Sequence, residues 1–517
     1  MNHENLLAGF ERFALKSPNN IALSIDERDY TYGELLSRVQ AIAGWIQFAI
    51  TPSNSRIGIL TSRDISGYIS IFGAAWAGAT FVPLNPKIPV ERLEKIMHQA
   101  DLIGVIYDDS CSDVFKCMSV GVKRIKNIRL VNGLSSQVQS NNKPLKVPAN
   151  TCDSDPVYLM FTSGTTGNPK GILATVGNLK HYLRFMQQRY QIKTFDRLSQ
   201  VFELSFDASI FDLFMSINHG ASFHVVPENL LLAPGAFIKE KMLTLWFGVP
   251  SHISFMNKMG LLVPNSFPEL RISVFGGEPM PKASMDVWRI AAPNSKMDNV
   301  YGPTEATITC FVQDCNDSTA VTEDREVMSI GKPYDDMYGA IVDEASNFVG
   351  LEQKGQLLIS GPQVTSGYWS NEELTHLKFR ELVHPTFGQR RWYFTGDMAY
   401  EDKDGIFHHL GRIDNQIKLS GYRVELEEID AVLRKAACCD AVAAVPWPAE
   451  HGSARGIVAF ICGSKRDLVV IREKMLDILP QYMVPRRFIF SESLPYTLNG
   501  KVDRKLLAEK LEKEVKH

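Results

Sequence analysis

The segment Tyr158–Ile172 (YLMFTSGTTGNPKGI) carries the densest group of chemically capable residues in the chain. An apolar run typical of a buried strand leads directly into glycines, hydroxyl side chains and one lysine, Lys170. Glycine lets the backbone approach an anion, and hydroxyls, backbone N–H groups and lysine all donate to phosphate oxygens. The spacing differs from GxxxxGK[ST], so this is not the common P-loop. We interpret the segment as a phosphate-binding loop rather than a flexible surface turn.

Two later blocks, Phe275–Glu278 (FGGE) and Asn299–Glu305 (NVYGPTE), also place glycine beside polar groups. In the second block, Tyr301 offers a flat ring on which a purine can stack. Thr304 and Glu305 can face phosphate and Mg²⁺, because this cation prefers carboxylate oxygens shared with phosphates. Read alone, the second block could also be a plain turn.

These blocks resemble, in order and spacing, those of the adenylate-forming superfamily, and within it the amino-acid adenylation domains of nonribosomal peptide synthesis. The resemblance runs from Gly78–Arg92 (GATFVPLNPKIPVER) to Asn499–Lys505 (NGKVDRK) and covers most of the chain. It implies ATP and Mg²⁺ as cofactors, with Glu305 at the metal ion. It also implies that ATP is bound by Thr162, Ser163, Gly164, Thr165, Thr166, Gly167, Lys170, Gly277, Glu278, Asn299, Tyr301, Gly302, Thr304, Asp397 and Arg412.

The resemblance assigns further roles to single residues. Asp397, in the block YFTGDMA, would chelate the ribose diol, although a solvated loop aspartate would look the same in isolation. Asp414 would be the hinge about which a C-terminal domain rotates between two half-reactions, and Gly421 would lie in the loop that then approaches the thiol donor. Lys501 would be the mobile catalytic lysine, which bridges the substrate carboxylate and the ATP α-phosphate and stabilises charge in the transition state.

The same comparison predicts an amino-acid pocket. Asp207 matches the aspartate that pairs with the substrate α-ammonium in amino-acid-activating relatives; its alternative role is to cap a helix over Ser209–Phe214. The other pocket positions would be Ala208, Phe211, Phe247, Val274, Gly276, Val300, Ile308 and Thr309. Most of these are apolar, and we expect Phe211 and Phe247 on opposite walls of a slot for a side chain like that of Ile, Val or Leu.

The predicted reaction is ATP-dependent activation of a small apolar α-amino acid to its aminoacyl-AMP, with release of pyrophosphate. The acyl group would then pass to the phosphopantetheine thiol of a separate carrier protein. We expect a freestanding enzyme, since the short segment after Lys505 contains no carrier motif. A D-alanine–carrier protein ligase is the nearest alternative, followed by an acyl- or aryl-CoA ligase. A nucleotide sensor without activity would be expected to lack Lys501 or Glu305.

The elements that must position these residues alternate between helices and short β-rich runs, which predicts α/β layers with largely parallel sheets. Leu35, Val39, Ile42 and Ile46 recur at helical spacing within Tyr32–Ala49, which therefore reads as an amphipathic helix. Arg56–Leu60 reads as a buried strand, Ala75–Leu84 as a helix end, glycine turn and strand, and Leu506–Val515 as a charged terminal helix.

At 517 residues the chain is too long for one core. We expect an N-terminal adenylation core over residues 1–411 that includes a small β-rich subdomain around Gly355–Tyr368. A small mobile α+β domain would follow over 412–517.

The formal net charge is −3, which gives no general electrostatic reason to bind nucleic acid or an acidic membrane. No secretion signal and no apolar run long enough to span a bilayer is recognised. The eight cysteines lack metal-ligand spacing, so we expect free thiols in a cytoplasmic protein.

Overall fold

The computed structural model describes residues 5–49, 55–123, 125–131, 133, 143–164, 168–316, 320–414, 416–419, 421–450, 453–463, 467–495 and 502–515. Lys501 and the loop residues Thr165, Thr166 and Gly167 lie outside the described residues. All predictions for these residues therefore remain predictions.

A nine-stranded sheet forms one half of the N-terminal body. Its six central strands are parallel, and both edges end in antiparallel strands. In spatial order the strands are β17 (Lys332–Pro333), β14 (Phe311–Asp314), β13 (Lys296–Tyr301), β12 (Ile272–Gly276), β11 (Leu245–Gly248), β9 (Arg197–Gln200), β10 (Ser222–Val225), β1 (Ile21–Ile25) and β2 (Arg28–Thr31).

A six-stranded sheet forms the other half and ends in the phosphate-loop hairpin. Its order is β6 (Lys126–Leu130), β5 (Gly104–Asp108), β3 (Arg56–Leu60), β4 (Thr80–Leu84), β7 (Pro156–Thr162) and β8 (Lys170–Thr175). Only the β7–β8 pair is antiparallel. The predicted strand at Arg56–Leu60 and the largely parallel α/β class are thus confirmed.

Helices pack between and around these two sheets, and their buried side chains form one large core and two smaller clusters. The helices are α1 (Ala8–Lys16), α2 (Tyr32–Ala49), α3 (Ile65–Trp76), α4 (Val90–Gln99), α5 (Ser112–Cys117), α6 (Val120–Lys123), α8 (Val176–Tyr190), α9 (Ser209–Asn218), α10 (Gly235–Glu240), α11 (Pro250–Lys258) and α12 (Lys282–Ala291). The helix predicted from the spacing of Leu35, Val39, Ile42 and Ile46 is confirmed, and all four side chains are buried.

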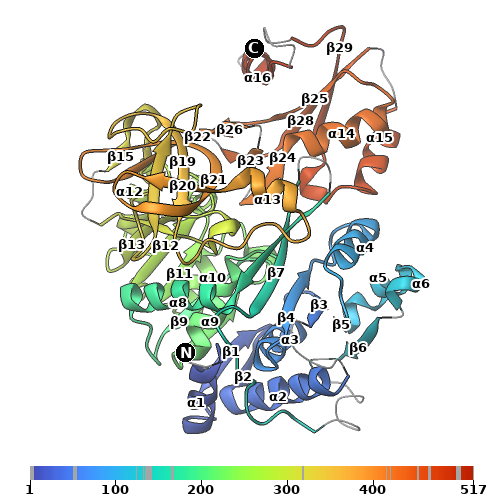
Figure 1. Cartoon of the computed structure of the whole chain (residues 1–517), viewed down its shortest axis with the longest axis vertical. Coiled ribbons are helices and arrows are strands. Elements are labelled where there is room, and N and C mark those ends of the chain that lie inside the picture. Colours follow the sequence, from blue (N-terminus) through green and yellow to red (C-terminus); the bar gives the residue numbers. More distant parts are fainter. Residues whose placement is uncertain are drawn as a thin grey trace.

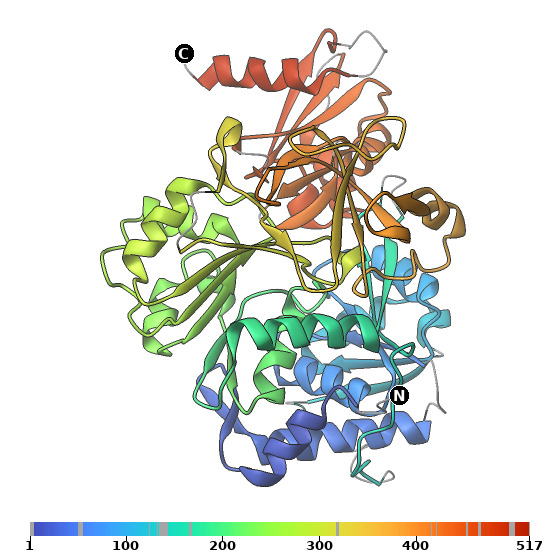
Figure 2. The same cartoon turned by 60° about the vertical axis from the view of Figure 1, so that its left-hand side comes forward.

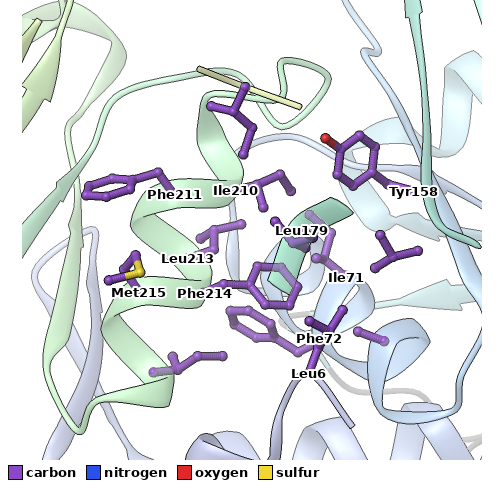
Figure 3. Packing of buried hydrophobic residues seen from close by; sticks show 14 of the residues in the cluster. Leu6, Ile71, Phe72, Tyr158, Leu179, Ile210, Phe211, Leu213, Phe214 and Met215 are labelled. Atoms are coloured by element: carbon purple, nitrogen blue, oxygen red, sulfur yellow. The ribbon is translucent and has the colours of Figure 1, made fainter. Parts of the chain in front are cut away.

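Helix α9 lies at the centre of this core and follows directly on Asp207 and Ala208. Phe214 meets Phe72 of α3 edge to face, with ring centroids 5.9 Å apart. Figure 3 shows Phe214 turned toward Phe72, while Phe211 lies on the other side of the helix. The helix therefore joins the two halves of the body with one face and presents Phe211 with another.

An antiparallel sheet follows in the sequence and forms the expected β-rich subdomain. It comprises β18 (Tyr338–Val342), β19 (Gly355–Ser360), β21 (Gly388–Glu401) and β20 (Phe379–His384), with β22 (Phe407–Arg412) paired to β21. Helix α13 (Glu372–Lys378) lies before β20, and the short strands β15 (Val321–Thr322) and β16 (Val327–Met328) form a separate ribbon.

The last hundred residues have their own core around α14 (Leu426–Ala437) and α15 (Leu468–Leu476). One sheet has the order β24 (Tyr422–Glu425), β23 (Gln416–Leu419), β27 (Ser453–Ala454) and β26 (Ala449–Glu450). A second has the order β25 (Val442–Pro446), β28 (Ile457–Cys462) and β29 (Arg487–Ser491), and helix α16 (Arg504–Val515) ends the chain.

Figures 1 and 2 show these orange and red elements gathered at one end of the molecule, with α16 far from the blue N-terminal helices. The chain leaves the five-stranded antiparallel sheet at the end of β22 (Arg412) and enters the C-terminal sheets at the start of β23 (Gln416). The domain boundary placed after residue 411 and the hinge at Asp414 stay predictions.

In the part of the chain that the structure describes, no helix has both the length and the apolar character needed to cross a membrane. All eight cysteines are described, and each is free of a disulfide.

Candidate active site

Four of the predicted pocket residues lie toward the carboxyl ends of neighbouring parallel strands. Phe247 of β11 lies opposite Val274 of β12, and Gly276 of β12 lies opposite Val300 of β13. In open parallel sheets, ligands bind outside the carboxyl ends of the strands. The parallel register therefore brings together pocket residues that the sequence separates widely.

Asp207 stands in the turn that precedes α9, and its Oδ2 has neither solvent contact nor a hydrogen-bond partner. Burial raises the pKa of this carboxyl, an effect that Thr304 and the charge of Lys418 partly oppose. Ala208, not Asp207, occupies the N-cap position of α9, and no side chain caps the helix. A half-buried carboxylate with an unpartnered oxygen suits a cationic ligand better than a structural cap.

Phe211 and Phe247 are in direct contact, with edge-to-face rings whose centroids lie 5.3 Å apart. Phe202 packs on the second ring at 5.0 Å, and Tyr182 and Tyr190 pack on the first. The expectation that Phe211 and Phe247 lie on opposite walls of an open slot is therefore wrong. The ring of Phe211 on α9 packs against the ring of Phe247 on β11, so no open slot separates them.

A strained turn carries the remaining predicted wall residues. Thr307 and Ile308 have φ values of +58° and +70°, a region that β-branched residues rarely adopt. The side-chain amide of Gln363 lies 3.2, 3.2 and 2.8 Å from the carbonyl oxygens of Ala306, Thr307 and Thr309. Gln363 is fully buried. This amide holds the strained turn in place.

Thr309 is the polar residue among the predicted walls of the pocket, and its hydroxyl is hydrogen bonded to the Tyr334 hydroxyl at 2.7 Å. Ile308 and Thr309 are both buried. The hydroxyl of Thr309 therefore already has a partner within the protein.

Asp397 and Arg412 lie opposite one another on the antiparallel strands β21 and β22. Arg412 Nη1 lies 3.0 Å from Asp397 Oδ1, and the Tyr301 hydroxyl donates to Asp397 Oδ2 at 2.5 Å. His409 Nε2 lies 3.3 Å from Oδ1. Burial alone would raise the pKa of Asp397, but Arg412 and His409 hold it well below its usual range. The carboxylate is thus ionised and oriented, as an acceptor for two hydroxyls must be.

Several other predicted nucleotide contacts have protein partners. The Asn299 side-chain amide donates to Ser329 O at 2.7 Å, and Glu278 Oε2 accepts from Ser251 N–H at the start of α11. Glu278 Oε1 has no partner among the described residues. Gly277 has a φ of +80°, and a Cβ at Gly302 would lie 2.4 Å from Thr309 Cα, so neither glycine can be replaced without strain.

The described part of the phosphate loop closes the antiparallel hairpin of β7 and β8, with Thr162 opposite Lys170. A Cβ at Gly164 would lie 2.0 Å from Asn168 O, so the backbone there folds back tightly on itself. Thr162 Oγ1 is buried without a hydrogen-bond partner. An unsatisfied hydroxyl beside Lys170 fits a phosphate ligand.

A hairpin from the C-terminal part, formed by β23 and β24, reaches into this loop. Arg423 Nη1 lies 2.9 and 3.2 Å from the two carboxylate oxygens of Glu305. Lys170 Nζ lies 3.0 Å from Glu425 Oε1, and Ser163 Oγ donates to Arg423 O at 2.8 Å. Burial opposes ionisation of Glu305, yet Arg423 and the Tyr368 hydroxyl lower its pKa to about 2.

The sequence prediction missed Lys418, Arg423 and Glu425, which this hairpin brings to the site. Lys418 lies opposite Arg423 in the ladder. Burial lowers the pKa of Lys418 and the charge of Arg423 lowers it further, while Asp397 and Asp207 oppose the shift. The alternation of polar and apolar residues in QIKLSGYRVE could have revealed one polar face of a hairpin, although not what that face contacts.

Among the described residues no group of three or more His, Cys, Asp or Glu side chains could hold a metal ion. Mg²⁺ in nucleotide sites needs only one or two carboxylates, because phosphates and water supply the other ligands. Glu305, buried and ionised in the short 3-10 turn Thr304–Ala306, fits that role.

Comparison with known proteins agrees with this geometry. Residues 10–369 match the family model of AMP-binding enzymes. The chain is 30% identical over 520 residues to delta-poly-L-ornithine synthetase of Acinetobacter baumannii, covering 98% of this chain and 37% of that protein. It is 29% identical over 527 residues to the D-alanine–D-alanyl carrier protein ligase of Bacillus velezensis, covering 98% and 99%. The chain thus spans little more than a third of the first relative and almost all of the second.

Among solved structures, the adenylation domain AlmE of Vibrio cholerae, in complex with glycyl-adenosine-5′-phosphate, superposes with a TM-score of 0.87. The two share 28% identity, and the match covers 99% of this chain and 98% of that one. These matches confirm the expected α/β class, the adenylate-forming family and the interpretation of the chain as an enzyme of that type. The chain belongs to the family of AMP-binding enzymes, and its fold is that of an adenylation domain.

Proposed function

We propose that this chain is an ATP-dependent, AMP-forming ligase that activates an α-amino acid and passes it to the thiol of a separate carrier protein. The observation that carries the amino-acid assignment is the Oδ2 of Asp207, which lies beside the predicted pocket without a partner. An α-ammonium group would supply the missing partner. A plain fatty or aryl acid would leave this carboxylate buried and uncompensated.

In the first half-reaction the chain's residues would hold two anions close together, the carboxylate of the amino acid and the triphosphate of ATP. Asp207 orients the amino acid through its ammonium group, Asp397 orients the ribose, and Lys170 and the loop N–H groups neutralise phosphate charge. Glu305 would hold Mg²⁺, which when bound would offset negative charge on the phosphates. An ionised carboxylate needs no general base, so positioning and charge stabilisation suffice. Lys501 would supply the last positive charge between the reacting groups.

In the second half-reaction a carrier thiol would attack the adenylate, and AMP would leave. Rotation of the C-terminal domain about Asp414 would remove Lys501 from the site and bring in the β23–β24 hairpin. Relatives whose names include a carrier protein support this part of the proposal. We further propose that both half-reactions occur in the cytoplasm.

For the side chain of the substrate we propose an aliphatic group such as that of Ile, Val or Leu, since Val274, Val300 and Ile308 offer only apolar contacts. A smaller substrate is the second candidate. The contact between Phe211 and Phe247 narrows the site, and the full-length match to a D-alanine ligase points the same way. ATP–pyrophosphate exchange with the twenty amino acids, D-alanine and several aryl acids tests both. Exchange driven only by an aryl acid would overturn the amino-acid assignment.

A further inference from the structure

One face of helix α8 lies behind the segments that build the predicted amino-acid pocket. Asn178, His181 and Phe185 follow one another at intervals of three and four residues, so their side chains share one side of the helix. The Asn178 amide donates to Pro362 O at 2.7 Å, and the Phe185 ring stacks on that of Tyr334 with centroids 3.8 Å apart. His181 lies between these two contacts along the helix and is nearly fully buried.

The two ends of the Gln363 side-chain amide can be told apart by what each end faces. Its nitrogen lies 3.2, 3.2 and 2.8 Å from the carbonyl oxygens of Ala306, Thr307 and Thr309. Carbonyl oxygens only accept hydrogen bonds, so the NH₂ group must point to the turn and Oε1 must point away from it. His181 Nδ1 lies 3.1 Å from this Oε1. Since Oε1 also only accepts, Nδ1 of His181 carries a proton and donates it to the bond.

This donation fixes the orientation of the Gln363 amide. Gln363 is fully buried and His181 nearly so, and neither side chain can exchange its partner for bulk water. If the amide turned over, its oxygen would face three carbonyl oxygens and its NH₂ group would face an N–H donor. On the other side of the imidazole, Nε2 has no hydrogen-bond partner among the described residues and lies 3.8 Å from Asp336 Oδ2. The imidazole therefore acts on the site through Nδ1.

The turn depends on a fixed amide because its backbone is strained. Thr307 and Ile308 have φ values of +58° and +70°, which β-branched residues adopt only where surrounding contacts hold them. Relaxation of this turn would move Ile308 and Thr309, two predicted walls of the pocket. The position of both walls thus depends on the Gln363 amide, and the amide depends on the proton at His181 Nδ1.

We propose that His181 is a positioning residue for the choice of amino acid, acting through Gln363 on the turn 306–309. It would touch neither the substrate nor the nucleotide. The inference rests on the proposed function in taking Ile308 and Thr309 as walls of the amino-acid pocket. It adds that one hydrogen-bond donor on α8 sets the shape of that pocket from outside.

Kinetics of pyrophosphate exchange with the preferred amino acid separate this role from general stability. His181→Leu removes the donor, whereas His181→Asn is close to leucine in size and places an N–H where Nδ1 stands. We expect His181→Leu to raise KM for the amino acid about tenfold, as for one lost buried hydrogen bond, and KM for ATP less than about twofold. His181→Asn should stay within about twofold of the wild type in both constants.

A double-mutant cycle tests whether His181 acts through Gln363. In the Gln363→Leu background, His181→Leu should raise KM for the amino acid less than about twofold further, because the amide is already gone. His224 is a matched control, since it is 6% exposed and its imidazole is hydrogen bonded to the Ser222 hydroxyl. His224→Leu should lower the melting temperature and leave KM for the amino acid unchanged. Equal increases from His181→Leu in both backgrounds would overturn the proposal, as would a His181→Asn enzyme impaired as strongly as His181→Leu.

Hydrogen–deuterium exchange of the free protein gives a readout that needs no substrate. His181→Leu and Gln363→Leu should both speed backbone exchange in the segment 303–310, which contains the hydrogen bonds of the turn, and His181→Asn should not. If His181→Leu does not fold, His181→Gln replaces it, because its side-chain nitrogen reaches the position of Nε2 rather than Nδ1. Unchanged exchange in this segment would overturn the inference. A wild type that activates no amino acid would instead refute the proposed function and leave this exchange result standing.

Discussion

Phe211 of α9 packs edge to face on Phe247 of β11, with ring centroids 5.3 Å apart. If both residues belong to the predicted pocket, the other contacts to a substrate side chain would come from the buried residues Val274, Val300 and Ile308. This arrangement makes substrate size the most direct test of the pocket.

Exchange activity should rank Ile, Val and Leu above Ala, and all four above polar amino acids. Alanine lacks three carbons of the Ile and Leu side chains, at about 0.8 kcal/mol each, so it should be about fifty-fold weaker than these two in kcat/KM. Asp, Asn and Lys would lose hydration without gaining partners. D-Alanine or glycine at the head of the ranking would show that Phe211 and Phe247 close the pocket to longer side chains.

Asp207 should give amino-acid activation a characteristic pH dependence. Only the ionised carboxylate pairs with an ammonium group, and burial raises its pKa above the ordinary value of 3.8. As pH falls through the raised pKa, kcat/KM for amino acids should fall. The exposed Asp404 offers a control: Asp404→Asn should keep the pH profile, and Asp207→Asn should abolish activation. An Asp207→Asn enzyme that still prefers amino acids would mean that the pocket is assigned wrongly.

Lys501 should matter for one half-reaction. Loss of one charge-stabilising donor costs about 10²–10³-fold, so Lys501→Ala should lower pyrophosphate exchange by at least that factor. Transfer from a preformed adenylate should change much less, because the lysine would have left the site. Lys505→Ala removes an exposed lysine nearby and should leave both steps intact. Equal losses in both steps for Lys501→Ala would contradict the rotation.

Gln363 should control the shape of the amino-acid pocket. Gln363→Leu removes the buried amide that holds Ala306, Thr307 and Thr309, at a cost of about 1–3 kcal/mol for each carbonyl left unsatisfied. We expect a several-fold increase in KM for the amino acid, a lower melting temperature and a smaller change in KM for ATP. Gln353→Leu, at an exposed position, is the control. Unchanged amino-acid KM together with a lower melting temperature would limit Gln363 to a structural role.

The strand and hairpin loop within residues 158–172 could be predicted, because an apolar run leads directly into glycines and hydroxyl side chains. The roles of Asp397 and Asp207 came from the family resemblance and remain predictions. The helix Tyr32–Ala49 followed from the helical spacing of its apolar residues, and the short run Arg56–Leu60 was correctly predicted as a strand. The contact of Phe211 with Phe247 could not be predicted, because it joins two elements that are distant in the sequence. Helix α9 begins at Ser209 and strand β11 begins 36 residues later, at Leu245.

The ion pair of Arg423 with Glu305 could not be predicted either, because the two residues are 118 positions apart and belong to parts of the chain with separate cores. The strain at Thr307 and Ile308 gives no local signal either. These β-branched residues favour extended backbone, and the distant Gln363 helps to hold the turn against that preference.

The two-faced strand β24 has a consequence for building hybrid enzymes. Val424 of this strand packs in the C-terminal core, while Arg423 and Glu425 pair with Glu305 and Lys170 of the N-terminal part. A cut at the hinge therefore separates residues that must match. A C-terminal domain grafted from a relative would bring its own Tyr422–Glu425 equivalent to Lys170 and Glu305. Functional chimeras should therefore depend less on where the junction is placed than on whether the grafted strand retains a cation and an anion at these two positions.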